Sequence, residues 1–377
     1  MRKILLIYFI LIVFLHGKHN PGYCQQSGDH TKHLIYSFER AEPLKMSEII
    51  SDISYIQLET NPECLLGYMN LLYFGQNIIL RSADENESIY RFSLKGKYLN
   101  EIGKKGRGPN EYQNCSDVRL IGDTIYVLSG FTKSILCYSL AGNFIKRYQI
   151  DINTSLKTFI QLSDESFLIS LYSSNNLGQI IKTDKAFNLE SRFMKNNPVD
   201  NNPLPIRFQR SDDKILYCNP FHNIIWDVST GHPIPEIILE YKKFRVSDNR
   251  LSNDPKYDAM LNNPYIIDFN ANKKYVKINF YYPYRKNKCT LLYNIFQGKQ
   301  FDWTKLINDI DYGTLDRWQG LLVDDRLIFH LMPITILKRL ENMTESEKQN
   351  PASSRFVEMA SKLSPNSNPV IMVCKLK

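Results

Sequence analysis

The sequence lacks the short motifs that mark the common catalytic and metal-binding sites. It has only seven histidines, no H-E-x-x-H or H-x-H pair and no G-x-S-x-G. These absences argue against the usual zinc motif and the usual nucleophile motif. His222, His232 and His330 stand alone. The sequence therefore assigns no catalytic residue, no metal ligand and no cofactor.

The chain also lacks the charge pattern of a nucleic-acid-binding protein. Its formal net charge is +8, and removing the three cations Arg2, Lys3 and Lys18 with a predicted leader leaves +5, spread along the chain. Proteins that bind nucleic acid gather their cations in a stripe or patch. We therefore expect no nucleic-acid partner and interpret the mild basicity as a solvated surface.

Long apolar runs are absent except at the N-terminus. There, MRK precedes ILLIYFILIVFL at residues 4–15, which is the basic-then-apolar plan of a secretory signal. The run of about 12 residues is shorter than the roughly 20 that span a bilayer. The sequence therefore predicts a signal peptide over residues 1–24 and an exported protein, located in the periplasm or at the outer membrane or cell surface.

Cys24 is the candidate for lipidation, because GYCQQ places it where a lipoprotein signal carries its acylated cysteine. Tyr23 stands where a small residue is expected, however, and cleavage after Cys24 fits as well. A membrane is thus expected only through this candidate lipid anchor. The six other cysteines are scattered without any C-x-x-C. They do not form a disulfide framework, and we expect buried free thiols.

An internal repeat is the strongest signal in the chain. Tyrosine and phenylalanine, 23 and 20 in number, favour strands. SIYRFSLKGKYLNEI (88–102) and SILCYSLAGNFIKRY (134–148) align without a gap as strand, Gly-containing turn and strand. The turn positions that we take as equivalent are Gly96, Gly142, Phe187, Gly231 and Gly298. Their spacing is about 45 residues, with one longer step that holds an insertion.

This spacing predicts an all-β fold, a six-bladed β-propeller of four-stranded blades with small helical insertions. The chain ends in VIMVCKLK (370–377), which matches the third strand of a blade. SYIQLET (54–60) can supply the missing fourth strand, so an N-terminal strand closes the ring. The predicted organisation is 1–24 signal peptide, 25–53 N-terminal extension and 54–377 propeller, with insertions at about 241–264 and 332–369. A β-sandwich with a helical domain is the alternative, but it leaves the even spacing unexplained.

The signal, the blade spacing, IGKKGRGPNEY and the closing NPVIMVCKLK together resemble the exported six-bladed β-propeller family of Bacteroides-type bacteria, whose blades are related to NHL repeats. In that family the loop reads more like G-x-G-x-G-P-G-E-Y/F. The matching positions here are Gly103, Gly106, Gly108, Pro109, Glu111 and Tyr112, while Asn110 replaces a glycine. Asn tolerates the left-handed backbone better than most residues. The resemblance covers nearly the whole mature chain, and it implies a fold and export, not a reaction.

Blade topology predicts which face carries a site. With strands a to d running outward from the axis, the b–c and d–a connections emerge on one face, here called the loop face. GKKGRGPNEY (103–112), the insertions 241–264 and 332–369, and YYPYRKNK (281–288) all belong to such connections. Insertions gathered on one face of a repeat protein often mark its binding face.

GKKGRGPNEY matches neither the P-loop nor the dinucleotide fingerprint, because its glycine spacing is G-x-x-G-x-G and no Ser or Thr follows. An anion nest with Lys104, Lys105 and Arg107 stays open beside the simpler interpretation, a glycine-rich crossing between blades. DENES (84–88) carries carboxylates suited to calcium, but a solvated loop is the simpler interpretation.

YYPYRKNK offers tyrosine faces for stacking and a guanidinium for carboxylates, unless its tyrosines pack between blades. The candidate ligand-binding residues are therefore Lys105, Arg107, Tyr112, Tyr281, Tyr284 and Arg285. The sequence favours a binding or interaction module for a protein, peptide or glycan. The alternatives are a metal-dependent propeller hydrolase or lyase with ligands from several blades at the central channel, and a structural partner in an envelope complex.

Overall fold

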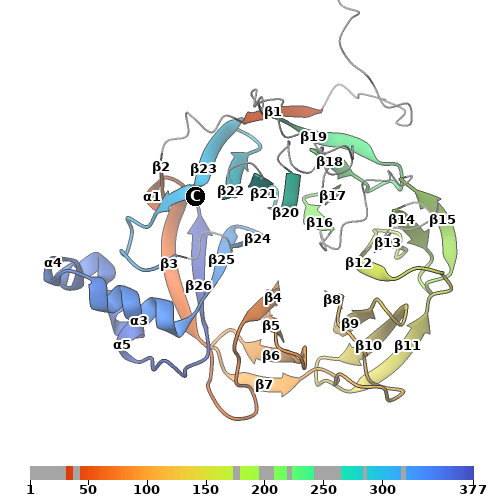
Figure 1. Ribbon diagram of the computed structural model, residues 1–377, viewed down its shortest axis with the longest axis horizontal. Coiled ribbons are helices and arrows are strands. Elements are labelled where there is room, and N and C mark those ends of the chain that lie inside the picture. The colour runs from red at the N-terminus through yellow and green to blue at the C-terminus, as the bar shows by residue number, and fades with distance from the viewer. Residues whose placement is uncertain are drawn as a thin grey trace, which may run out of the picture.

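The computed structural model describes residues 31–36, 43–172, 179–194, 208–218, 223–241, 265–282, 287–315 and 320–377. In these ranges the chain forms six sheets arranged as a ring around a central axis, which confirms the predicted propeller (Figure 1). The predicted signal peptide, Cys24 and most of the insertion at 241–264 lie outside the described residues. No helix in the described part of the chain is long and apolar enough to cross a membrane.

Each blade is an antiparallel sheet of four consecutive strands, except that the last one uses an N-terminal strand. Blades 1 to 3, from the inner to the outer strand, are β4 (Met69–Phe74), β5 (Asn77–Ser82), β6 (Ile89–Ser93) and β7 (Tyr98–Glu101); β8 (Asp117–Ile121), β9 (Thr124–Ser129), β10 (Ser134–Ser139) and β11 (Phe144–Gln149); and β12 (Leu156–Gln161), β13 (Phe167–Leu171), β14 (Ile180–Thr183) and β15 (Leu189–Phe193). Blades 4 to 6 are β16 (Gln209–Ser211), β17 (Lys214–Cys218), β18 (Ile224–Asp227) and β19 (Ile234–Tyr241); β20 (Tyr265–Ala271), β21 (Tyr275–Tyr282), β22 (Asn287–Asn294) and β23 (Lys299–Ile307); and β24 (Leu321–Val323), β25 (Arg326–Leu331), β26 (Val370–Leu376) and β3 (Ile50–Gln57).

The ring closes in blade 6, as the sequence predicted. β3 pairs antiparallel with β26, and Ser54 lies opposite Val373 in their register. The N-terminal and C-terminal ends of the propeller therefore share one sheet, with β3 as its outer strand (Figure 1).

The predicted N-terminal extension contributes further strands that the sequence did not reveal. β1 (Lys32–Tyr36) pairs in parallel with β19 of blade 4, and β2 (Pro43–Lys45) pairs in parallel with β23 of blade 5. A single helical turn, α1 (Met46–Ile49), then leads into β3. β1, β2 and β3 thus lie on the outside of three neighbouring blades, and β1 and β2 each add a fifth strand to one of them (Figure 1).

The repeat alignment correctly identified the outer turns. The five positions taken as equivalent all adopt a positive φ, from 65° at Gly298 to 85° at Gly142, including the non-glycine Phe187 at 67°. Two of these glycines also permit close contact between blades. A Cβ at Gly96 would lie 2.0 Å from the carbonyl oxygen of Gln57, and one at Gly142 would lie 2.2 Å from that of Glu101.

The helical insertion leaves the ring between β25 and β26, within the predicted range 332–369. It consists of α3 (Pro333–Asn342), α4 (Glu345–Gln349), the 3-10 helix η3 (Pro351–Ser353) and α5 (Ser354–Ser361). The helices lie outside the ring beside β3, not over the loop face (Figure 1). Ile336 and Phe356 are fully buried there, and the Arg355 side chain donates to the carbonyl of Ile53. The insertion therefore packs on the rim of blade 6, because its apolar face is buried against that blade.

Apolar side chains pack between neighbouring blades. Between blades 1 and 2, for example, Ile79, Val127 and Tyr138 are almost completely buried in one cluster. All six described cysteines are buried, and none of them forms a disulfide, as expected for thiols that behave as small apolar side chains.

Candidate functional site

The loop 103–112 crosses from blade 1 to blade 2 on the loop face, and its glycines accommodate one of its own side chains. Gly108 N donates to the Glu111 carboxylate at 2.8 Å, and a Cβ at Gly106 would lie 2.0 Å from Glu111 Oε2. Of the loop glycines Gly103, Gly106 and Gly108, only Gly103 has a positive φ. The φ of Asn110 is not positive. The loop's own glutamate therefore already pairs with the amide of Gly108, and the anion nest stays a prediction.

Tyr112 does not reach the surface. Its side chain is 0% exposed in the cluster between blades 1 and 2, and its hydroxyl donates to the carbonyl of Glu87 at 3.1 Å. Burial raises the pKa of this phenol well above its usual value. Tyr112 is thus a packing residue of the blade junction, which corrects its candidacy as a ligand contact.

The two predicted cations of this loop differ in their partners. Lys105 Nζ donates to the carbonyl of Glu85 at 2.6 Å and lies 3.9 Å from the carboxylate of Glu87, so it ties the loop to the b–c connection of blade 1. Arg107 is exposed, and neither its side chain nor that of Lys104 makes a hydrogen bond or ion pair to any described residue. Of the pair, Arg107 is therefore the cation that faces solvent.

Of the second group of candidate ligand-binding residues, Tyr281, Tyr284 and Arg285, the structure describes only the first. Tyr281 is half-buried at the end of β21, opposite Tyr265 and Lys288 in the ladder of blade 5. Tyr284 and Arg285 lie outside the described residues. The role of these three residues as ligand contacts stays a prediction.

Among the described residues, the most exposed aromatic side chains of the loop face come from positions that the sequence analysis did not select. Tyr68, in the connection from blade 6 to blade 1, is 74% exposed, and Phe131, in the b–c turn of blade 2, is 67% exposed. Leu65, 58% exposed, precedes Tyr68 in the same connection. We call Leu65, Tyr68 and Phe131 the apolar trio.

Hydrogen bonds hold the backbone of Tyr68 and Phe131 in place. Ala83 N donates to the carbonyl of Tyr68 at 2.8 Å, which joins that connection to the b–c loop of blade 1. Phe131 N donates to Asn114 Oδ1 at 3.1 Å, and this oxygen also accepts from Ser129 Oγ. Asn114 belongs to the same crossing as the cationic loop, so the trio and the cations are carried by mutually bonded connections.

A local signal for these aromatics exists in the sequence. Both follow a glycine in a connection, as Gly67–Tyr68 and Gly130–Phe131. Gly130 is required by close packing, because a Cβ there would lie 2.0 Å from the carbonyl of Leu156 in blade 3. The exposure of the ring itself depends on neighbouring blades, and no local pattern encodes it.

At the inner strands, a buried carboxylate links three blades. Asp117, at the start of β8, is 0% exposed and accepts from Thr158 Oγ1 of β12 at 2.5 Å and from Arg119 Nε at 3.2 Å. The Arg119 guanidinium also donates to the carbonyl of Phe208, just before β16. This charge is therefore compensated as buried charges require. Among the described residues, no group of three or more His, Cys, Asp or Glu side chains could hold one metal ion.

Comparison with known proteins supports the fold. The sequence model of a family described as a domain of unknown function (DUF4934) matches residues 33–375. The fold is similar to the crystal structure of a Bacteroides fragilis NCTC 9343 protein (BF0058) that is predicted to be exported, with a TM-score of 0.70, 17% identity and coverage of 92% of this chain and 99% of that one. It is also similar to a DUF4221 family member from Bacteroides vulgatus ATCC 8482, with a TM-score of 0.53, 10% identity and coverage of 87% and 97%.

These matches confirm the resemblance to a propeller family of Bacteroides-type bacteria. At such identities, likeness to the two crystal structures shows the fold alone. The sequence matches none of the curated proteins with which it was compared.

Proposed function

The protein belongs to the DUF4934 family, whose description assigns no activity, and we propose that it is an exported binding module of the bacterial envelope. Its ligand is a protein, peptide or glycan that contacts the loop face over blades 1 and 2. The observation that carries this proposal is the exposure of the apolar trio on connections that are fixed by hydrogen bonds.

Rigid, exposed aromatic side chains suit a binding surface. Tyr and Phe offer a large contact area with few rotatable bonds, so little conformational entropy is lost when a ligand covers them. Residues of this kind, with arginine, are enriched among the anchors of protein interfaces. Arg107 and Lys104 stand on the neighbouring crossing and are free to pair with an acidic group of the ligand.

The test compares two variants of the mature chain. Tyr68→Ser/Phe131→Ser removes both aromatic rings, and Phe296→Ser removes an equally exposed ring from the turn between β22 and β23 on the opposite face. Phe296 is a matched control, because its amide is also held by an asparagine, Asn294, at 3.1 Å. Ligands would be selected from a glycan array and a displayed peptide library.

We expect ligands selected by the unaltered chain to bind the double variant at least about tenfold more weakly, since interface anchors contribute about 2 kcal/mol or more each. The same ligands should bind Phe296→Ser unchanged. Retention of binding by the double variant, or equal loss in the control, would contradict the loop-face assignment.

The export and anchoring parts of the proposal have their own assay. The basic and apolar leader supports export, and Cys24 supports a lipid anchor. If Cys24 is acylated, globomycin blocks processing, and Cys24→Ser moves the protein from the membrane fraction to the soluble fraction. Processing that is insensitive to globomycin would show that the leader is removed without lipidation.

A further inference from the structure

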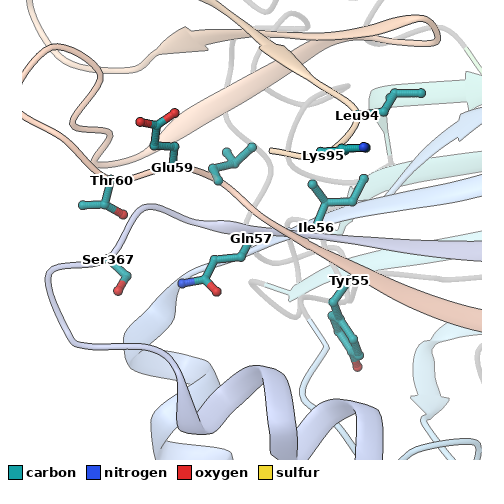
Figure 2. Close-up of a pocket in the computed structure, with 9 residues that line it drawn as sticks. Tyr55, Ile56, Gln57, Glu59, Thr60, Leu94, Lys95 and Ser367 are labelled. Carbon is teal, nitrogen blue, oxygen red and sulfur yellow. The ribbon is translucent and has the colours of Figure 1, made fainter. Parts of the chain in front are cut away.

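A groove of about 500 Å³ lies on the outer rim where blade 6 meets blade 1 (Figure 2). One wall is the chain from Tyr55 to Thr60, which covers the second half of β3 and the residues that follow it. Leu94 and Lys95, from the turn between β6 and β7, and Ser367, just before β26, complete the lining. Its volume is in the range of ligand sites.

The walls of the groove are held by a buried asparagine at the ring closure. Asn368, 0% exposed, donates through Nδ2 to the carbonyls of Glu59 and Cys64 and accepts through Oδ1 from Leu66 N. The backbone amide of Asn368 donates to Thr60 Oγ1 at 2.8 Å. The groove is therefore formed before any ligand arrives, which lowers the entropic cost of binding.

In two blades of this protein, the outer strand pairs with an additional strand from the N-terminal segment. β1 adds in parallel to β19, and β2 adds in parallel to β23, each as a fifth strand on the outside of its blade. β3 occupies the same outermost position in blade 6 and carries no fifth strand among the described residues. Strand addition to a free edge is a general mode of peptide recognition.

The length of free edge limits what can bind. At one end the Arg355 side chain donates to the carbonyl of Ile53 at 3.0 Å, and α5 packs there. At the other end Glu59 N donates to the carbonyl of Gly96 at 2.8 Å, where the blade 1 turn meets β3. Only a short extended segment fits between these two contacts.

Direction and charge identify that segment. A strand that is parallel to β3, as β1 and β2 are to their partners, has its C-terminal end at the blade 1 turn. Lys95 stands at this end, exposed and without a hydrogen bond or ion pair from its ammonium group to any described residue. Gln57, also exposed, lines the groove on the side of Ser367 (Figure 2).

We propose that this groove binds the C-terminal tail of a protein partner as a short strand parallel to β3, with the terminal carboxylate at Lys95. Main-chain hydrogen bonds to the strand edge supply affinity, and the ammonium group selects a free carboxylate. The groove borders the connection that carries Leu65 and Tyr68, but Lys95 lies in the turn between β6 and β7, which is not a loop-face connection. The proposal therefore does not depend on the function proposed above.

The test uses the mature chain and fluorescein-labelled pentapeptides of alternating threonine and valine, which favour an extended conformation. One peptide ends in a free acid, a second ends in an amide, and a third is an amide with one internal glutamate. Fluorescence anisotropy measures their binding to the unaltered chain and to Lys95→Glu, Lys97→Glu and Ser367→Trp. Lys97 belongs to the same turn but does not line the groove, so it is the matched control.

We expect the free acid to bind about tenfold or more tightly than both amides, the selectivity that one charge-assisted hydrogen bond provides. Lys95→Glu should remove this preference, Lys97→Glu should keep it, and Ser367→Trp should abolish binding by filling the groove. Equal binding of the acid and the amides, no saturation up to about 1 mM, equal effects at Lys95 and Lys97, or intact binding to the tryptophan variant would overturn the proposal. A thermal melt of each variant shows that the fold is retained.

Discussion

Asn368→Ala should destabilise the protein more than the loss of any exposed asparagine, because Asn368 joins chain segments that close the ring. Its side chain makes three hydrogen bonds, of 2.7 Å from Leu66 N, 2.6 Å to Glu59 O and 2.8 Å to Cys64 O. With its side chain fully buried, the truncation removes one hydrogen-bond partner from a donor and from two acceptors. Each buried group left unsatisfied costs about 1 to 3 kcal/mol.

The three losses are not equal. The carbonyl of Glu59 keeps a second donor, the thiol of Cys64 at 3.3 Å, whereas no other described residue accepts a hydrogen bond from Leu66 N. We therefore expect a total loss of about 3 to 4 kcal/mol in the free energy of unfolding. That is a large part of the roughly 5 to 15 kcal/mol that stabilises a typical domain, and for a propeller of this length it corresponds to a fall in Tm of about 4 to 6 °C.

Differential scanning calorimetry and urea titration of the mature chain measure this loss. Asn143→Ala is the control, because Asn143 is exposed in an outer turn and its side chain makes no hydrogen bond to a described residue. Its Tm should change by less than about 2 °C. If Asn368→Ala melts within this margin of the unaltered protein, the three hydrogen bonds do not stabilise the closure and the reasoning is refuted.

Two further predictions concern the blade junctions and the thiols. Gly96→Ala should lower the free energy of unfolding by about 2 kcal/mol or more, because the new Cβ meets the Gln57 carbonyl. Gly231→Ala has a similar φ of 80° but no atom within 4 Å of the new Cβ, so it should lower that free energy by only about 1 kcal/mol in chemical denaturation. Equal losses would show that backbone strain alone matters. Burial raises the pKa of the Cys137 thiol to about 11 and that of Cys374 further, so neither should react with DTNB at pH 8 until urea unfolds the chain. Rapid labelling of the folded protein would contradict the closed packing.

Local signals were sufficient for the fold. The turn at Gly96 and the turn at Gly142 recur at one spacing, and both adopt the same left-handed backbone. The strand at 54–60 was assigned to the closing blade because an outer edge would otherwise be open, and β3 pairs there with β26. These features depend on strand length, turn chemistry and the count of strands, which are all encoded within short stretches of sequence.

The candidate site was predicted less well, because the exposure of a loop side chain depends on how neighbouring blades pack against it. Tyr112 is an aromatic residue in a cationic loop and was therefore predicted to contact a ligand, yet it is buried because blade 2 packs over it. Tyr68 and Phe131, which resemble any loop aromatics in sequence, project from the surface.

By itself, the sequence determined the repeat, the six blades and the glycine-rich crossing, because each follows from patterns within short stretches of chain. The closing strand followed from counting the strands of the last blade, although it pairs with a distant part of the chain. Tertiary structure decided which aromatics face solvent, that Glu111 fills its own loop, and that β1 and β2 add to distant blades. It also placed Asn368 against residues about three hundred positions away, at a junction where the groove forms. Such contacts leave no periodic trace in the sequence, because they arise only when the ring has closed.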